Sequence, residues 1–185
     1  MDTNYDQAME GTNMNLTDIW PLEKWVELEN DIHMRYGMDV NVFNTDGIRI
    51  SEFKQWVNKL CPAVKATDKG QSFICAVAHM NLAVQAMQTR KPVIEECDAG
   101  LVKIVVPIFL DETFLGAVGA CGLLLDDGET DTFLINKITG IEEETAERLS
   151  ADIGTISNKN AAALASDVTL RVEGIVADYK KSTAE

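Results

Sequence analysis

The spacing of apolar residues predicts three amphipathic helices. In residues 22–36 apolar positions recur at helical intervals, and the flanking Pro21 and Gly37 favour a helix start and a helix end. Residues 160–181 show a similar pattern near the end of the chain. In residues 70–89 five apolar residues step by four, three, four and three, so they form one apolar face: Phe73, Val77, Met80, Val84 and Met87.

A period of two replaces the helical period after the first helix. Residues 38–43 alternate apolar and polar side chains, which is typical of a half-buried strand. Residues 44–47 end in Asp-Gly, a strong hairpin signal, and predict residues 48–50 as the returning strand. Ser51 would then cap a short helix that Pro62 ends or redirects. The apolar positions of this helix would be Phe53, Trp56, Val57 and Leu60.

A second hairpin is predicted in the middle of the chain. Residues 93–97 begin a short strand, residues 101–110 are rich in β-branched residues, and residues 114–125 form the partner strand. Pro107 argues for a strand edge or a bulge. The glycines of the partner strand, Gly116, Gly119 and Gly122, indicate bulges or the close approach of another group.

The order of these elements is helix, hairpin, helices, hairpin, helices. Antiparallel strands with segregated helices are typical of an α+β fold, here an antiparallel sheet flanked by helices with further helices at both ends. Residues 1–19 are polar and predict a flexible tail. Residues 20–181 contain no linker, so we expect one domain there.

The charge of the chain limits its partners. Of 185 residues, 16 are Lys or Arg and 30 are Asp or Glu, which gives a net charge of −14. Nucleic-acid binders need clustered Lys and Arg, and anionic membranes attract the same residues, so we expect neither partner. The beginning of the chain lacks a secretory signal pattern, and the longest apolar stretch is too short to cross a bilayer. We therefore expect a cytoplasmic protein.

The four cysteines are the most informative residues. In the cytoplasm they stay reduced, and no two form a Cys-x-x-Cys pair. Cys75 and His79 share one helical face, and Cys61, Cys97 and Cys121 lie at ends or turns of other elements. Thiolates and an imidazole from separate elements could converge on zinc, iron or an iron–sulfur cluster. Haem is a less favoured candidate for the bound group. The alternative without a metal is four buried thiols that pack as small hydrophobic side chains.

No catalytic motif is visible. The sequence has no phosphate-binding glycine loop, no dinucleotide fingerprint, no Gly-x-Ser-x-Gly elbow and no His-Glu-x-x-His. Cys75 and His79 could form a nucleophilic pair, but no third partner is apparent. We therefore expect a binding protein and not an enzyme.

Residues 61–125 resemble the PocR sensory domain, a ligand-binding module of bacterial signalling and regulatory proteins. The resemblance rests on Cys61, on Cys75 and on Cys-Asp-Ala-Gly-Leu at residues 97–101. It continues through Val-Pro-Ile, Phe-Leu-Gly and Gly-Ala-Cys-Gly up to residue 122. With the flanking elements it covers about residues 20–181.

This resemblance implies a PAS-like fold that senses small molecules such as short diols. The pocket would lie between the sheet and the helices, with these ligand-binding residues: Cys97, Asp98, Ala99, Gly100, Leu101 and Gly119. Two positions depart from the family pattern. Asp98 stands where many members have His, and Cys121 stands where a small residue is usual, which favours the metal hypothesis. Such modules usually precede an output domain, but the resemblance uses up nearly all of the 185 residues. We therefore expect either an excised fragment or a free-standing sensor that signals through a protein partner or a homodimer. The exposed faces of its first and last helices are the expected contact surfaces.

Overall fold

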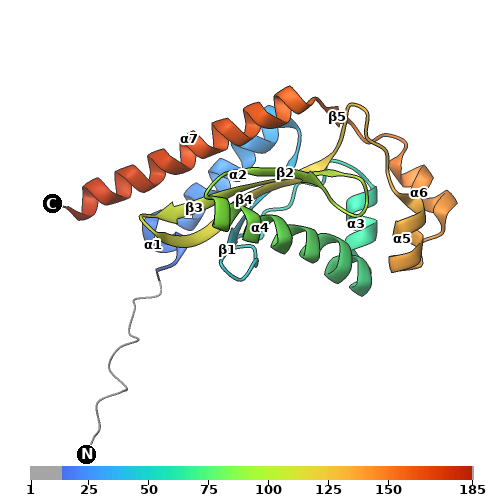
Figure 1. Cartoon of the computed structure of the whole chain (residues 1–185), viewed down its shortest axis with the longest axis horizontal. Coiled ribbons are helices and arrows are strands. Elements are labelled where there is room, and N and C mark those ends of the chain that lie inside the picture. Colours follow the sequence, from blue (N-terminus) through green and yellow to red (C-terminus); the bar gives the residue numbers. More distant parts are fainter. Residues whose placement is uncertain (1–13, 185) are drawn as a thin grey trace, which may run out of the picture.

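The computed structural model describes residues 14–184 and centres on one antiparallel sheet. Its four main strands lie in the order β1-β4-β3-β2. Their bounds are Asp39–Asn44 (β1), Val93–Glu96 (β2), Val102–Leu110 (β3) and Thr113–Leu125 (β4). A two-residue strand, β5 (Thr155–Ile156), pairs in parallel with the end of β4. Helices flank the sheet, so the predicted α+β class is confirmed (Figure 1).

Two long helices cover one face of the sheet. They are α2 (Leu22–Tyr36), which ends at the left-handed Gly37 as expected, and α7 (Asn158–Thr183). Their buried residues share a core with those of the sheet, among them Trp25, Ile32, Val40, Ile104, Leu164 and Val168. None of the helices in residues 14–184 combines the length and apolar composition that a membrane span requires.

The packed domain begins earlier than we predicted. Leu16–Ile19 form a short helix, α1, and both of its terminal residues are buried. The indole N–H of Trp25 donates a hydrogen bond of 3.0 Å to the carbonyl oxygen of Leu16, which fixes α1 against α2. The predicted tail at residues 1–19 is therefore wrong for its last four residues, whereas residues 1–13 lie outside the described part of the chain.

Shorter helices cover the opposite face and one end of the sheet. A π-helix, η1 (Gly70–Ala76), runs into α4 (Val77–Thr89), whose Leu82 and Ala86 pack on Val105 and Ala117. The helices α3 (Leu60–Lys65), α5 (Thr132–Thr139) and α6 (Glu143–Ser150) gather at the end. They enclose a second apolar cluster that includes Leu60, Val64, Ile74, Leu101 and Ile135.

The strand predicted as half-buried is covered on both faces. Val40 and Val42 point into the core beneath α2, as their alternation requires. Asp39 and Asn41 point the other way, yet only 3% and 1% of their surface is exposed. The polar half of β1 therefore faces the interior of the protein and not solvent.

The segment after β1 departs from the prediction. Residues 48–50 form only an isolated bridge, Phe43 with Arg49, and no helix begins at Ser51. Pro62 lies inside the first turn of α3. N–H groups in a first turn make no hydrogen bond within the helix, so a proline there costs none. By contrast, Pro107 lies where β3 extends past its pairing with β2, which confirms the expected strand edge.

The predicted apolar face of residues 70–89 is exposed. Phe73 is 57% exposed, and the other four residues of that face are 39–41% exposed. Ala78 and Ala86 are buried instead, because small residues let α4 approach the sheet closely.

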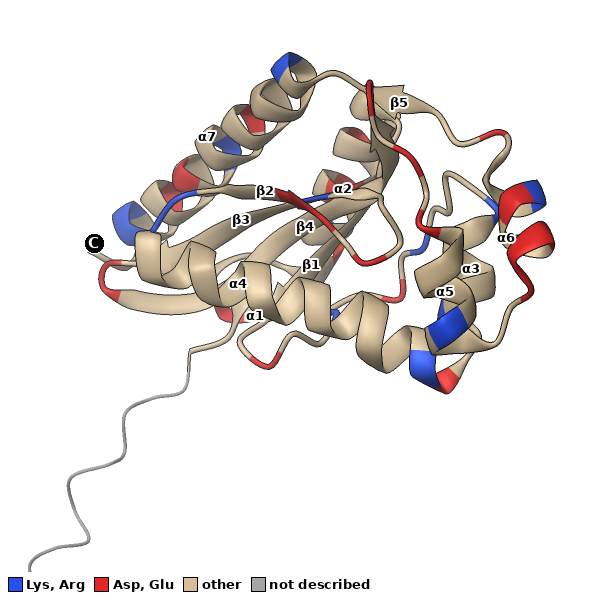
Figure 2. Ribbon diagram, turned by 45° about the vertical axis from the view of Figure 1, so that its right-hand side comes forward, with Lys and Arg blue, Asp and Glu red and all other residues tan. Residues whose placement is uncertain are grey.

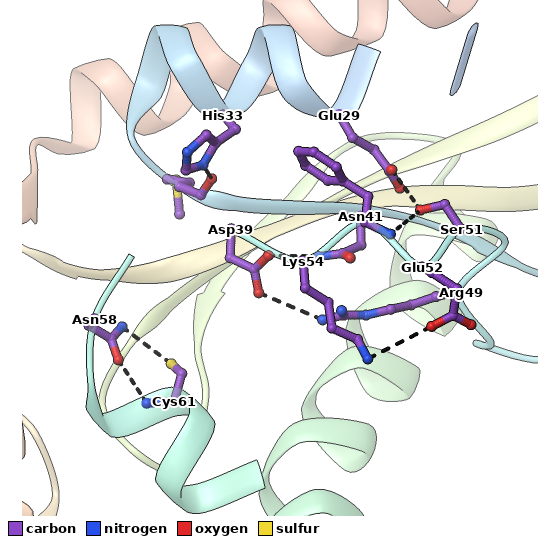
Figure 3. Close-up of polar contacts among 12 residues, drawn as sticks. Glu29, His33, Asp39, Asn41, Arg49, Ser51, Glu52, Lys54, Asn58 and Cys61 are labelled. Atoms are coloured by element: carbon purple, nitrogen blue, oxygen red, sulfur yellow. Dashed lines mark hydrogen bonds and ion pairs between the residues drawn. The ribbon is translucent and has the colours of Figure 1, made fainter. Parts of the chain in front are cut away.

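A buried carboxylate joins α2 to β1 and to the segment beyond it. Glu29 is fully buried, and its two oxygens accept hydrogen bonds from the Val42 N–H (2.6 Å) and the Ser51 hydroxyl (2.7 Å). Figure 3 shows the link to Ser51. Burial raises the pKa of Glu29, with smaller opposing effects from these two donors. Ser51 thus stabilises a tertiary contact and does not cap a helix.

We expect Glu29→Ala to lower the free energy of unfolding by about 3 kcal/mol, because it leaves two buried donors without an acceptor. Chemical denaturation measures this. The matched control is Glu27→Ala on the same helix, whose side chain is 63% exposed and which should change stability by less than about 0.5 kcal/mol.

The pH dependence gives a second readout. The folded-state pKa of Glu29 lies above its ordinary value of 4.5. The contribution of this shift to the free energy of unfolding is therefore fully present below pH 4.5 and is lost as the pH rises through the folded-state pKa. Glu29→Gln removes this titration, so the variant should gain stability relative to wild type between acidic and neutral pH. A constant difference would contradict the assignment.

Candidate functional site

A cavity of about 100 Å³ lies between the sheet and the helices η1, α4 and α3. The sheet contributes the polar face of β1 and the facing positions of β3 and β4, which antiparallel pairing aligns: Asp39 opposite Cys121, and Lys103 opposite Cys121 on its other side. A larger groove of about 390 Å³ lies between β3 and α7, but in the part of the chain that the structure describes it contains no buried polar atom without a partner. The smaller cavity is therefore the candidate site.

The structure brings most of the predicted site residues together here. All four cysteines line the cavity, as do His79, Leu101 and Gly119. Ala99 does not line it and packs in the neighbouring apolar cluster. Asp98 and Gly100 line a separate, open surface hollow beside α5. The Cys-Asp-Ala-Gly-Leu segment thus contributes only its two ends to the cavity.

The wall formed by β1 is polar and hydrogen-bonded. The side-chain amide of Asn41 donates to a carboxylate oxygen of Asp39 at 3.0 Å. The other carboxylate oxygen of Asp39 lies 3.6 Å from Nη2 of Arg49, as Figure 3 shows. The side-chain oxygen of Asn41 is buried without a hydrogen-bond partner among residues 14–184. This wall therefore offers an unused acceptor to whatever occupies the cavity.

Arg49 enters the cavity from the segment after the turn. Its Nε and Nη1 atoms are buried and have no hydrogen-bond partner within the described residues. Trp56 lies 5.9 Å from its guanidinium carbon and 5.6 Å from Nζ of Lys65, measured to the ring centroid. Burial, and then the charge of Arg49, lowers the pKa of Lys65. Two cations thus lie against the ring of Trp56 at the cavity wall.

His79 forms part of the opposite wall. Its ring stacks on Phe43 with centroids 3.8 Å apart. Burial, with the nearby cations, lowers the pKa of His79 to about 3, so the imidazole is neutral at physiological pH. Nδ1 is buried without a partner in residues 14–184. Gly119 makes this packing possible, since a Cβ there would lie 2.9 Å from the Phe43 ring and 3.5 Å from Nδ1.

Three of the four thiols are neutral in this environment. Burial raises the pKa values of Cys61, Cys75 and Cys121. Asn58 holds Cys61 in place, since its amide donates to Sγ at 3.3 Å and its oxygen accepts from the Cys61 N–H at 2.7 Å. A thiol must lose its proton to act as a nucleophile, so the raised pKa values of these three thiols do not favour that role.

The geometry gives the metal hypothesis no direct support. Within residues 14–184 no three His, Cys, Asp or Glu side chains are positioned to hold one ion. The four thiols and His79 surround a shared space, yet their side chains would have to move to ligate a common centre. The proposed zinc, iron or iron–sulfur site therefore stays a prediction from the sequence.

A π-helix shapes the helical wall. Gly70 begins η1, and a Cβ there would lie 2.2 Å from the carbonyl oxygen of Val64, so the close approach of α3 requires glycine. From this element Gln71 and Cys75 reach the cavity, followed by His79 from α4. Wide helical turns of this kind are rare and often occur at functional sites. Their presence here supports the assignment of the site.

Sequence reasoning missed the charged residues of the site. Arg49, Lys65 and Lys103 line the cavity, and none of them was expected to. One signal was available, because Lys103 is a lone cation in the otherwise apolar run of residues 101–110. A cation at a buried strand position indicates a functional role, since burying an unpaired charge is costly. No similar sequence pattern surrounds Arg49 or Lys65.

Comparison with known proteins yields one family. Residues 18–176 match the family model described as "Sensory domain found in PocR", which covers nearly the whole chain. No curated protein and no solved structure is significantly similar to the chain.

We expect Cys61, Cys75 and Cys121 to react slowly with iodoacetamide in the native protein and rapidly in denaturant, because burial limits access and keeps the thiols protonated. Mass spectrometry of peptides measures the rate at each cysteine. Addition of a chelator should leave the native rates unchanged. Acceleration by the chelator would contradict this expectation and favour a thiolate-bound metal.

Proposed function

The chain belongs to the family of sensory domains found in PocR, and we propose that it binds a small molecule in the cavity formed by Arg49, His79 and the four cysteines. The observation that supports this most directly is a set of buried polar atoms without partners that all face one cavity. These atoms belong to Asn41, Arg49 and His79. Buried polar groups in folded proteins are nearly always hydrogen-bonded, so this set is typical of a binding site.

The size of the cavity limits the ligand. A volume of about 100 Å³ holds only a few water-sized groups, which suits a small metabolite and is too small for a nucleotide or a haem. Phe43, Trp56 and Leu101 supply apolar surface for a short carbon skeleton. A few placed polar groups on a partly apolar wall are typical of small-molecule sites.

We propose a binding role and not an enzymatic one. Among residues 14–184 no hydrogen bond joins His79 to a thiol, so these groups do not form a nucleophile–base pair. The lowered pKa of His79 makes its imidazole a weak base, and the raised pKa of Cys75 makes its thiol hard to ionise.

The metal centre stays the second candidate, because all four cysteines and His79 line the same space. Ligation would require the thiols to ionise and the side chains to converge. Metal analysis of anaerobically purified protein, together with its absorption spectrum, separates this candidate from a small organic ligand.

We further propose that the signal leaves through a homodimer formed by the exposed face of residues 70–89. This α4 stripe consists of Phe73, Val77, Met80, Val84 and Met87. Its steps of four and three are those of a two-helix seam. The segment contains no Asp, Glu, Lys or Arg, and Figure 2 shows α4 without charged positions. Two copies with a charge of −14 each can meet here without opposing like charges.

The stripe is adjacent to the cavity. Met80 follows His79, and a Cβ at Gly47 would lie 2.3 Å from the Met80 sulfur, so the stripe touches the turn that leads to Arg49. A ligand that shifts His79 or Arg49 would therefore move residues of the dimer face. The surface differs from the first and last helices that we expected from the sequence.

We expect a panel of small alcohols, diols, amides and carboxylates to contain at least one compound that raises the melting temperature. At one hundred times its dissociation constant, a ligand adds about 2.7 kcal/mol to stability. Gly119→Ala should abolish this shift, because the added Cβ displaces Phe43 beside His79.

The matched control is Gly174→Ala in α7, where a Cβ meets nothing within 4 Å. It should keep the ligand-induced shift and raise the unliganded stability slightly. A panel without any binder, or equal shifts in the two variants, would count against the proposed site.

We expect sedimentation equilibrium to show self-association of the wild-type chain and a mass near 20.4 kDa for Val84→Glu, because a buried charge opposes the seam. The control is Met34→Glu, a highly exposed methionine on α2 outside the stripe, which should still associate. A monomeric wild type, or equal dissociation of both variants, would contradict the dimer.

A further inference from the structure

Three cations line the cavity of this strongly acidic protein. They are Arg49, Lys65 and Lys103, and Asp39 is the one carboxylate in its lining among the described residues. Lys103 is 8% exposed, and neither lysine has an ion pair within residues 14–184. The interior surface therefore has the opposite charge from the chain as a whole.

Arg49 has donors to spare. Only its Nη2 approaches a carboxylate, that of Asp39, and the separation of 3.6 Å is longer than a hydrogen bond. Nε and Nη1 are buried without an acceptor in the described chain. A guanidinium cannot lose its charge in proteins, and a buried charged donor without a partner is costly. The site is therefore incomplete without an acceptor.

Residues 14–184 offer no second buried counter-ion to these cations. Both oxygens of Glu29, the nearest other buried carboxylate, accept hydrogen bonds from Val42 and Ser51. Burial keeps Cys75 and Cys121 protonated, so they do not balance the cations as thiolates. An external anion would pair with Arg49 and favour the charged form of Lys65.

We infer that the cavity recognises a small organic carboxylate, whose oxygens accept hydrogen bonds from Arg49 and whose charge is balanced by Lys65 and Lys103. This rests on the proposed function and names the ligand class for the same cavity. The apolar part of the ligand lies against Phe43 and Trp56. The mixture of cations and aromatic surface in so small a space fits a short organic acid better than inorganic phosphate.

The test compares ligands that share a skeleton and differ in charge. Calorimetric titration of the full chain uses lactate, lactamide and 1,2-propanediol as one series, butyrate and butyramide as a second, and inorganic phosphate as a third arm. We expect at least one carboxylate to bind at least about tenfold more tightly than its neutral counterparts, since hydrogen bonds to charged groups are the stronger ones.

Variants locate the contact. Lys65→Gln and Lys103→Gln should each weaken the carboxylate at least about tenfold. Arg49→Lys keeps the charge but loses the fixed donors of the guanidinium, so it should weaken the carboxylate as well. The control is Lys59→Gln, an exposed lysine paired with Asp152 outside the cavity, which should leave the affinity unchanged.

The outcomes separate this inference from the proposed function. Neutral compounds that bind as well as the carboxylates would overturn the inference and leave the sensory cavity in place. Binding of phosphate alone would also overturn it. If none of the compounds binds, both the inference and the proposed function are overturned. If the carboxylate binds the three cavity variants with unchanged affinity, the anion lies elsewhere and the inference is overturned.

Discussion

The alternation of side chains along the strands determines what this protein can do. Because successive residues point to opposite faces, β1 sends Val40 and Val42 into one core and Asp39 and Asn41 into the space beneath α4. The same rule places Gly119 and Cys121 of β4 opposite their partners on β1. With helices on both faces, neither set reaches bulk water. One face of the sheet is an apolar core, and the other is a polar interior that must be satisfied or filled.

The polar interior explains several features that look unrelated along the chain. Glycines at positions 70 and 119 let α3 approach η1 and let the ring pair of Phe43 and His79 approach the sheet. A π-helix carries Cys75 toward the cavity. Burial keeps the imidazole neutral and the thiols of Cys61, Cys75 and Cys121 protonated, and this leaves the cations as the dominant charges of the site. A PocR-family chain with a net charge of −14 thereby has a cavity lined mainly by cations.

Helix α4 has two apolar faces, one packed on the sheet and one on the surface, and the spacing of its apolar residues does not distinguish them. Its small residues, with Leu82, allow close packing on the sheet, while its larger apolar residues form the α4 stripe on the surface. The periodicity correctly placed Phe73, Val77 and Met80 on one face, but spacing alone does not say which face meets the sheet. The face that meets the sheet is the one that carries the small residues and Leu82, and its Ala86 packs with Val105 and Ala117.

Local periodicity and short motifs were enough to predict the fold class, most helices and strands and the PocR family. They also drew attention to the four cysteines, which the fold places around one cavity. The prediction failed at residues 51–59, where the side chain of Ser51 binds Glu29, a residue twenty-two positions earlier. It also failed to place Arg49, Lys65 and Lys103 beside the thiols. It placed the whole segment 97–101 in one pocket, whereas only Cys97 and Leu101 of that segment line the cavity, and Asp98 and Gly100 line a surface hollow that Cys97 also reaches. Local sequence does not encode these points. Each depends on which elements pack together, and the burial and charge of a side chain are properties of that packing and not of its neighbours in sequence.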